Sequence, residues 1–382
     1  MKILTIVGAR PQFIKAAAIT RKIQSSFDRD VNEILVHTGQ HYDQYMSEVF
    51  FREMGIPEPA FNLGIGSANH GFQTGEMMRA LEELMLREKP AGVIVYGDTN
   101  STLAGALAAS KLFIPVIHIE AGLRSFNKSM PEEINRIVTD HVSTMMFSPT
   151  VTGIRNLERE GLVHGDSAPY HIDHPGIFHC GDIMYDNTLF FKKQSEAFSE
   201  VFENLKADRK NYLLATIHRP SNTDSTERLG QILNALLVIS KSLNTEIILP
   251  LHPRTAQKLR AFPDQSLIGS LDPLNGIHLI PPVSFLDMIR LESHARLIMT
   301  DSGGVQKEAW FLKKPVVILR AETEWVEITE HGNGILADAS TEKIVQSAEY
   351  FLNNPPADFP PVYGNGDAAR EILDIITTVR WG

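Results

Sequence analysis

The stretch AGVIVYGDTNSTLAGALAASKLFIPVIHIE, residues 91–120, indicates which fold this chain adopts. It predicts an apolar strand, an Ala-rich helix without internal proline and a second apolar strand, the order of a βαβ unit with parallel strands. Asp98 ends the first strand and Glu120 ends the second. Because open parallel sheets bind ligands at the carboxyl ends of their strands, both carboxylates are candidate site residues. The alternative is that they only cap the helices that follow.

A third carboxylate, Glu132, begins a predicted helix over residues 131–141. Pro131 suits the first turn of a helix, and an acid there complements the helix dipole. Glu132 and Arg136 are four residues apart, so they share a helix face on which an acid and a base could both contact an anionic sugar. The alternative is a surface ion pair that contributes little to stability.

The composition is that of a globular chain with a sizeable core. Of the 382 residues, 43% are hydrophobic, and no apolar run has the length of a membrane span. The net charge of −10 argues against nucleic acid as the main partner, since a long phosphate backbone requires a basic stripe. A small phosphorylated ligand needs only a few local cations and backbone N–H groups. The single cysteine, Cys180, excludes an internal disulfide and favours a cytoplasmic location, and residues 1–7 predict a first strand and no signal peptide.

Strand and helix patterns alternate along the chain up to about residue 183 and restart at residues 211–217. This alternation predicts the α/β class, with two Rossmann-like, doubly wound domains and a ligand cleft between them. We expect the domains to comprise residues 1–183 and 184–366. A final helix, within residues 367–382, is expected to pack back on the first domain.

The turn after the first predicted strand carries two cations, Arg10 and Lys15, within GARPQFIK (residues 8–15). A turn that leads from a strand into a helix is a common phosphate site. The turn lacks the glycine patterns of dinucleotide-binding and Walker-type loops, so neither of these is predicted.

The second half of the chain supplies a matching set of polar turns. His218 follows the first strand of that half and can donate a hydrogen bond to a phosphate or transfer a proton near neutral pH. Ser302, Gly303 and Gly304 lie between a later strand and its helix, where backbone N–H groups can approach a phosphate. Glu308, further along that helix, could accept hydrogen bonds from sugar hydroxyls.

A metal site is not predicted. His164, His171, His174 and Asp173 share one loop, but their spacing matches no zinc pattern and no cysteine pair supports one.

The chain contains eight short motifs in this order: GARPQFIK (8–15), HTGQH (37–41), YGDTNST (96–102), HIEAGLRS (118–125), MPEEINR (130–136), IHRPSN (217–222), LHP (251–253) and TDSGGVQKE (300–308). Taken together, these motifs resemble those of the non-hydrolysing UDP-N-acetylglucosamine 2-epimerase family over nearly the whole chain. The resemblance implies a GT-B arrangement, with the nucleotide held mainly by the C-terminal domain. It also implies a homodimer, a UDP-sugar substrate, and no metal or nicotinamide cofactor.

The family's reaction inverts C2 of the sugar by anti elimination of UDP to a 2-acetamidoglucal, followed by syn addition. The resemblance implies that Asp98, Glu120 and Glu132 are the essential carboxylates, with His218 beside them in the catalytic set. It assigns the phosphate and nucleotide contacts to further residues, and the contact near the sugar and phosphate to Lys15. The phosphate and nucleotide set is Arg10, Arg136, His218, Ser302, Gly303 and Gly304, to which Glu308 is added as a sugar-hydroxyl acceptor.

The chain departs from many members of the family at four places. One of them is ahead of Ser302, where Val283 and Met288 stand in place of a polar and an aromatic residue. Trp325 replaces the arginine of a Thr-Glu-Arg-Pro turn, and residues 42–44 differ from the sequence seen in many bacterial members. Residues 69–71 replace a stretch that helps some members bind a second UDP-GlcNAc as an activator. Residues 62–71, 122–137 and 322–327 look more like the branch that acts on UDP-2,3-diacetamido-2,3-dideoxy-glucuronate.

Four functions therefore stay open at this point. The first is UDP-GlcNAc 2-epimerisation for surface polysaccharide precursors, and the second is the same reaction on the diacetamido-glucuronate nucleotide. More distant alternatives are a hydrolysing epimerase and a GT-B glycosyltransferase or silent nucleotide-sugar binder. A silent binder of a pyrophosphate would gain nothing from three acids facing its ligand.

Overall fold

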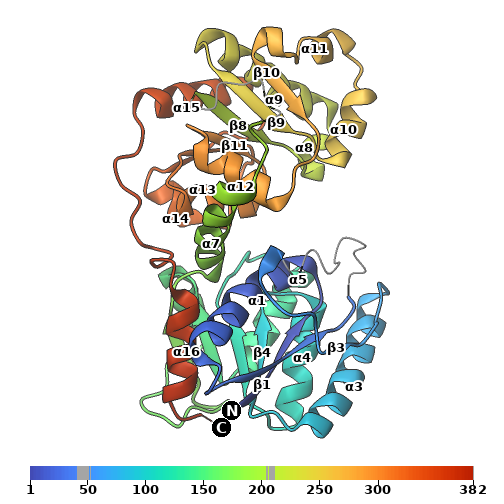
Figure 1. The fold of residues 1–382 in the computed structure, drawn as a ribbon, viewed down its shortest axis with the longest axis vertical. Helices are drawn as coiled ribbons and strands as arrows, with labels where there is room; N and C mark the ends of the chain where they lie inside the picture. The colour runs from blue at the N-terminus through green and yellow to red at the C-terminus, as the bar shows by residue number, and fades with distance from the viewer. Residues whose placement is uncertain (41–50, 52, 204, 206–210, 382) are drawn as a thin grey trace. The chain divides into compact units, whose positions relative to one another are not determined.

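The structure is a computed structural model, and it describes residues 1–40, 51, 53–203, 205 and 211–381. The chain forms two compact units (Figure 1): the first unit is Met1–Asn187 with Pro361–Gly382, and the second unit is Thr188–Pro360. Each contains one parallel sheet with helices, which confirms the predicted α/β class. The departure at residues 42–44 lies outside the described residues.

The sheet of the first unit has the strand order β3-β2-β1-β4-β5-β6-β7, and every pair in it is parallel. The order reverses between β1 and β4, so the turns that leave these two strands diverge and open a crevice at the carboxyl edge. The strands are β1 Lys2–Val7, β2 Asn32–His37, β3 Phe61–Asn62, β4 Gly92–Tyr96, β5 Val116–Ile119, β6 Met145–Ser148 and β7 Gly176–His179. The helices are α1 Arg10–Lys22, η1 Ile23–Phe27, α3 His70–Glu88, α4 Asn100–Lys111, α5 Pro131–His141, α6 Val151–Arg159, α7 Ile183–Phe198, which continues into the second unit, and α16 Ala368–Thr378.

The predicted central unit is present as β4, α4 and β5. All five residues of β4 are buried, as expected for a strand covered on both faces. The Ala-rich sequence of α4 allows the helix to lie close to the sheet: a Cβ added at Gly105 would lie 2.8 Å from Cδ1 of Ile6 on β1. Close packing of small residues on branched ones thus fixes the start of α4, which lies beside the crevice.

The C-terminal helix α16 belongs to the first unit, where it lies beside α1 (Figure 1). Its first N–H groups, those of Ala368 and Ala369, donate to the Asp186 carboxylate over 3.1 and 3.0 Å. Asp186 thereby satisfies N–H groups that have no partner within the helix. An ion pair between Lys22 and Asp367, 2.8 Å long, adds a second link.

The second unit repeats the architecture with the order β10-β9-β8-β11-β12-β13, again parallel. The order here reverses between β8 and β11. The strands are β8 Tyr212–Thr216, β9 Glu246–Pro250, β10 Ile277–Ile280, β11 Ile298–Thr300, β12 Val316–Ile318 and β13 Gly334–Leu336. The helices are α8 Pro220–Thr223, α9 Thr226–Ser242, α10 Pro253–Arg260, α11 Gln265–Gly269, η2 Pro273–Asn275, α12 Phe285–His294, α13 Gly303–Phe311, α14 Val326–Glu330 and α15 Thr341–Asn353. Among the described residues, no helix is long and apolar enough to cross a bilayer.

The contact between the Asp186 carboxyl group and the start of α16 predicts a specific dependence of stability on pH. Burial raises the pKa of Asp186 to about 6, even though the two N–H donors oppose this. The folded state therefore holds a proton between about pH 4 and pH 6 that the unfolded chain has lost, so this group's contribution to stability declines as the pH rises through that window. We expect the stability of Asp186→Asn relative to the wild type to be about 2–3 kcal/mol higher at pH 7 than at pH 4.

Urea unfolding at both pH values measures this difference. Asp374→Asn removes a negative charge from an exposed position on α16, the helix that Asp186 contacts, and serves as the control. A pH-independent difference between Asp186→Asn and the wild type would contradict the prediction.

Candidate functional site

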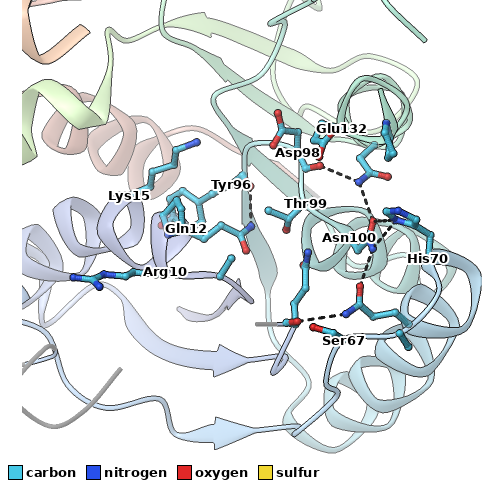
Figure 2. Close-up of a pocket in the computed structure, with 17 residues that line it drawn as sticks. Arg10, Gln12, Lys15, Ser67, His70, Tyr96, Asp98, Thr99, Asn100 and Glu132 are labelled. Atoms are coloured by element: carbon cyan, nitrogen blue, oxygen red, sulfur yellow. Dashed lines mark hydrogen bonds between the residues drawn. The ribbon is translucent and has the colours of Figure 1, made fainter. Parts of the chain in front are cut away.

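The first unit contains a pocket of about 930 Å³ at the carboxyl edge of its sheet, beside the ends of β1 and β4. Figure 2 shows Arg10 and Lys15, from α1, on one side and Asp98 and Glu132 on the other. The pocket therefore brings together four of the charged residues that the sequence predicted. Its lining consists of Ala9, Arg10, Pro11, Gln12, Lys15, Gln40, Ser67, Ala68, His70, Gln73, Tyr96, Asp98, Thr99, Asn100, Pro131, Glu132 and Asn135.

The turn from β1 into α1 is fixed by Gln12, which sequence reasoning missed. This buried side chain accepts from Gly8 N over 2.8 Å and donates to the Tyr96 carbonyl over 3.0 Å and to Thr102 Oγ1 over 2.9 Å. One amide thus joins the ends of β1 and β4 and places Arg10 at the pocket. Gly8 is required here, since a Cβ would lie 1.8 Å from Ser101 Oγ.

Asp98 follows β4 and forms an ion pair with Arg136 of α5. Thr99, not Asp98, caps α4 by accepting from Thr102 N. Arg136 also pairs with Glu133 over 2.7 Å, so its acidic partners are Asp98 and Glu133 rather than the expected Glu132. Although burial opposes it, these two carboxylates raise the pKa of Arg136. Arg136 thus supplies a fixed positive charge beside the Asp98 carboxylate.

Glu120 follows β5 with a φ of +73° and pairs with Lys15. A Cβ added at Gly97 would lie 3.1 Å from both Glu120 Oε2 and Lys15 Nζ, so this ion pair lies against the backbone next to Asp98. Burial opposes the charge on Lys15, but the Glu120 and Asp98 carboxylates raise its pKa. Glu120 is not one of the described residues that line the pocket and reaches it through Lys15.

Glu132 lies in the first turn of α5, is exposed, and lines the pocket. The pocket thus combines an exposed carboxylate and an Arg-paired carboxylate with cations from α1. Groups of these types can transfer protons and can bind an anion in the same space.

A chain of amide side chains supports the turn after β4. Asn135 donates to the Asp98 carbonyl over 2.9 Å, and Asn100 donates to Gln73 over 2.8 Å (dashed in Figure 2). His70, within one of the sequence departures, lies 3.1 Å from the Asn100 amide nitrogen. The only sequence signal for this network was polar residues at helix positions that would otherwise be apolar.

His118 supports the same turn from within the core. Its Nε2 lies 2.8 Å from the Gly97 carbonyl oxygen, and its Nδ1 lies 2.6 Å from Asp140. Arg124 pairs with Asp140 over 2.7 Å. Burial works against the Asp140 charge, but His118 and Arg124 together lower its pKa. The buried Asp140 charge, compensated by His118 and Arg124, therefore fixes the position of Gly97, the residue that precedes Asp98.

In the second unit, Asp301 organises the turns that leave β8 and β11. Its fully buried carboxylate accepts from the backbone N–H of His218 over 3.1 Å and of Arg219 over 3.0 Å, and from the Asn222 amide over 3.1 Å. Burial lowers the pKa of the His218 imidazole, against the attraction of Asp301. The sequence motif contained Asp301, but sequence reasoning gave it no role.

The predicted Ser-Gly-Gly turn forms the start of α13. Ser302 accepts from Val305 N as the helix cap, and Gly303 and Gly304 are the first two helical residues. A Cβ would meet no described atom closer than 3.6 Å at Gly303 or 3.7 Å at Gly304, so the fold itself does not require glycine at either position. Free N–H groups at a helix start without side chains form a favourable anion site.

Two further residues of this turn differ from expectation. Glu308 is buried, with 8% of its surface exposed, and burial raises its pKa to about 7. Lys307 places its ammonium 4.1 Å from the centre of the Trp325 ring, so a cation is retained beside the position where the indole replaces an arginine.

Comparison with known proteins agrees with these features. The family model for UDP-N-acetylglucosamine 2-epimerase matches residues 24–377. A UDP-N-acetylglucosamine 2-epimerase homolog of Methanococcus maripaludis is 47% identical over 98% of this chain and 99% of its own length. A UDP-2,3-diacetamido-2,3-dideoxy-D-glucuronate 2-epimerase of Pseudomonas aeruginosa is 45% identical over 98% and 99%. The crystal structure of Methanocaldococcus jannaschii UDP-GlcNAc 2-epimerase in complex with UDP-GlcNAc and UDP is 41% identical, covers 99% of each chain and superposes with a TM-score of 0.80. The chain belongs to the UDP-N-acetylglucosamine 2-epimerase family of enzymes, which confirms the resemblance found in its motifs.

Proposed function

We propose that this enzyme is a non-hydrolysing 2-epimerase that interconverts UDP-GlcNAc and UDP-ManNAc. In this proposal, UDP leaves to give 2-acetamidoglucal and then adds back after the C2 proton has returned on the other face. The observation that carries the proposal is the placing of Asp98 and Glu132 in one pocket with Lys15 and Arg10, with Glu120 bound to Lys15.

Each half of the reaction has a matching set of groups. Removal and return of the C2 proton require carboxylates at the sugar, and we assign these steps to Asp98, Glu120 and Glu132. Departure of UDP leaves negative charge on the pyrophosphate, and fixed cations and N–H dipoles stabilise such charge. Arg10, Lys15 and Arg136 supply the cations of the first unit.

We assign the nucleotide to the second unit. The start of α13, at Ser302, Gly303 and Gly304, supports a pyrophosphate contact, and His218 is held beside it through Asp301. Glu308 is proposed to accept hydrogen bonds from the ribose hydroxyls. We further propose that the enzyme is a homodimer that works in the cytoplasm on precursors of surface polysaccharides.

The second candidate substrate is UDP-2,3-diacetamido-2,3-dideoxy-glucuronate. The Pseudomonas aeruginosa relative named for that substrate is 45% identical, whereas the Methanocaldococcus jannaschii UDP-N-acetylglucosamine 2-epimerase is 41% identical. Proton NMR of the purified enzyme with each nucleotide in D₂O separates the candidates. UDP-ManNAc with deuterium at C2 supports the proposal. Free ManNAc and UDP would replace it with a hydrolysing epimerase, and turnover of the glucuronate nucleotide alone would change the substrate.

Asp98→Asn tests the acid–base assignment. The amide cannot take up the C2 proton, so we expect turnover to fall by about 10²–10⁴-fold while UDP still binds. Asp173→Asn makes the same chemical change at an exposed acid and should leave turnover unchanged. Deuterium incorporation at C2 and calorimetric binding of UDP are the two measurements. Turnover of Asp98→Asn close to that of the wild type would remove Asp98 from the mechanism.

Gly303→Ala and Gly304→Ala test the pyrophosphate site. The protein has space for either methyl group, so the melting temperature should not fall, and alanine favours a helix over glycine. A bound pyrophosphate would meet the methyl group, and we expect UDP affinity to fall about tenfold or more, about 1.4 kcal/mol. Gly269→Ala, on an exposed helix of the same unit, is the control. Unchanged UDP affinity in both variants would move the pyrophosphate away from α13.

A further inference from the structure

Glu292 is a buried acid that the proposed mechanism does not use. It lies on α12, none of its surface is exposed, and neither of its carboxyl oxygens accepts a hydrogen bond from a donor in the described part of the chain. Burying a carboxyl group without a donor destabilises the folded state. An apolar side chain of similar size would fill the same space without that cost, so the acid calls for an explanation.

The group that faces Glu292 from the neighbouring helix is a second acid, Glu308. Helix α12 packs against α13, and the two buried carboxyl groups are close enough to interact electrostatically. Tyr212 of β8 is also close, but its hydroxyl donates to the Leu291 carbonyl. Arg290 lies on the same helix as Glu292, and Lys307 faces Glu308.

Two carboxyl groups in contact inside a protein cannot both ionise, so the pair holds one proton near neutral pH. Burial, reinforced by the Glu308 charge, raises the pKa of Glu292 well above its usual range. Burial also raises the pKa of Glu308, but the hydrogen bond from Glu292 and the Lys307 charge oppose this increase. Glu292 is fully buried, whereas Glu308 keeps 8% of its surface exposed and has the Lys307 ammonium nearby, so the charge is better tolerated on Glu308. We therefore place the proton on Glu292 and treat Glu308 as the acceptor.

We propose that Glu292 is a positioning residue whose neutral carboxyl group donates a hydrogen bond to Glu308 and so holds Glu308 as the acceptor of the ribose hydroxyls of UDP. This inference rests on the proposed function, in which Glu308 binds the ribose. A carboxylate has about four lone-pair directions. The Glu292 proton uses one of them, and the others stay available for the two hydroxyls.

The test compares UDP with 2′,3′-dideoxy-UDP, which lacks both hydroxyls, by calorimetry at pH 7.5. Both nucleotides carry the same pyrophosphate, so any change in pyrophosphate binding, including one from titration of His218, affects both affinities equally and drops out of their ratio. We expect Glu292→Met to reduce the preference for UDP about tenfold, while its melting temperature rises by about 2–4 °C because a buried carboxyl group without a donor is gone. Glu292→Gln keeps a neutral donor at the same place and should retain the preference.

The pH dependence gives an independent readout. In the wild type, the preference for UDP should decline as the pH falls through about 7, because Glu308 then takes up a proton. Glu292→Met removes a donor that lowers the pKa of Glu308, so the midpoint should move to higher pH. Glu292→Gln should leave the midpoint near that of the wild type.

Glu308→Gln, alone and combined with Glu292→Met, completes a double-mutant cycle. This change alone should abolish the preference, and Glu292→Met added to it should have no further effect. Equal loss of affinity for both nucleotides in Glu292→Met, or an unchanged preference, would overturn the inference. Wild-type enzyme that fails to bind UDP would overturn the proposed function and this inference with it. Wild-type enzyme that binds UDP and epimerises, with Glu292→Met showing no change in preference, would overturn the inference alone.

Discussion

A charge taken out of water needs a partner, and this requirement shapes both sheet edges of the enzyme. Moving a carboxylate into a protein costs several kcal/mol unless a cation or hydrogen-bond donors compensate. In the first unit, Asp98 is compensated by Arg136 and Glu120 by Lys15. The partners come from α5 and α1, so the ion pairs tie those helices to the turns after β4 and β5. The ion pairs that offset the cost of burying these carboxylates also hold the carboxylates at the pocket.

The second unit meets the same requirement in two other ways. The Asp301 carboxylate is surrounded by three N–H donors, two from the backbone after β8 and one from the Asn222 amide. Glu292 and Glu308 share a single proton, which leaves one charge in place of two. An ion pair, a ring of N–H donors and a shared proton thus each keep an acid inside the fold, and each leaves that acid with a different chemical character.

The sequence was sufficient for the parts of the structure that depend on local pattern. Apolar runs and the Ala-rich segment predicted β4, α4 and β5, and their order placed Asp98 and Glu120 at one edge. The supporting residues were not predictable, because their partners lie far away along the chain. Gln12 contacts the Tyr96 carbonyl across 84 positions, and Asp301 contacts His218 across 83. Helix periodicity suggested Glu132 as the neighbour of Arg136, but a side chain chooses its partner in three dimensions, and Arg136 reaches Asp98 from another element.

The placement of α16 in the first unit has a consequence for how the enzyme is made. The chain leaves this unit at Asn187, completes the second unit, and returns only at Pro361. During translation the second unit can therefore fold while the first still lacks its last helix. Until residues 368–378 have left the ribosome, the surface of α1 that α16 covers stays exposed to water, and the Asp186 carboxylate lacks its two N–H donors. The unit that holds the pocket is therefore completed only after the residues of the second unit have been synthesised.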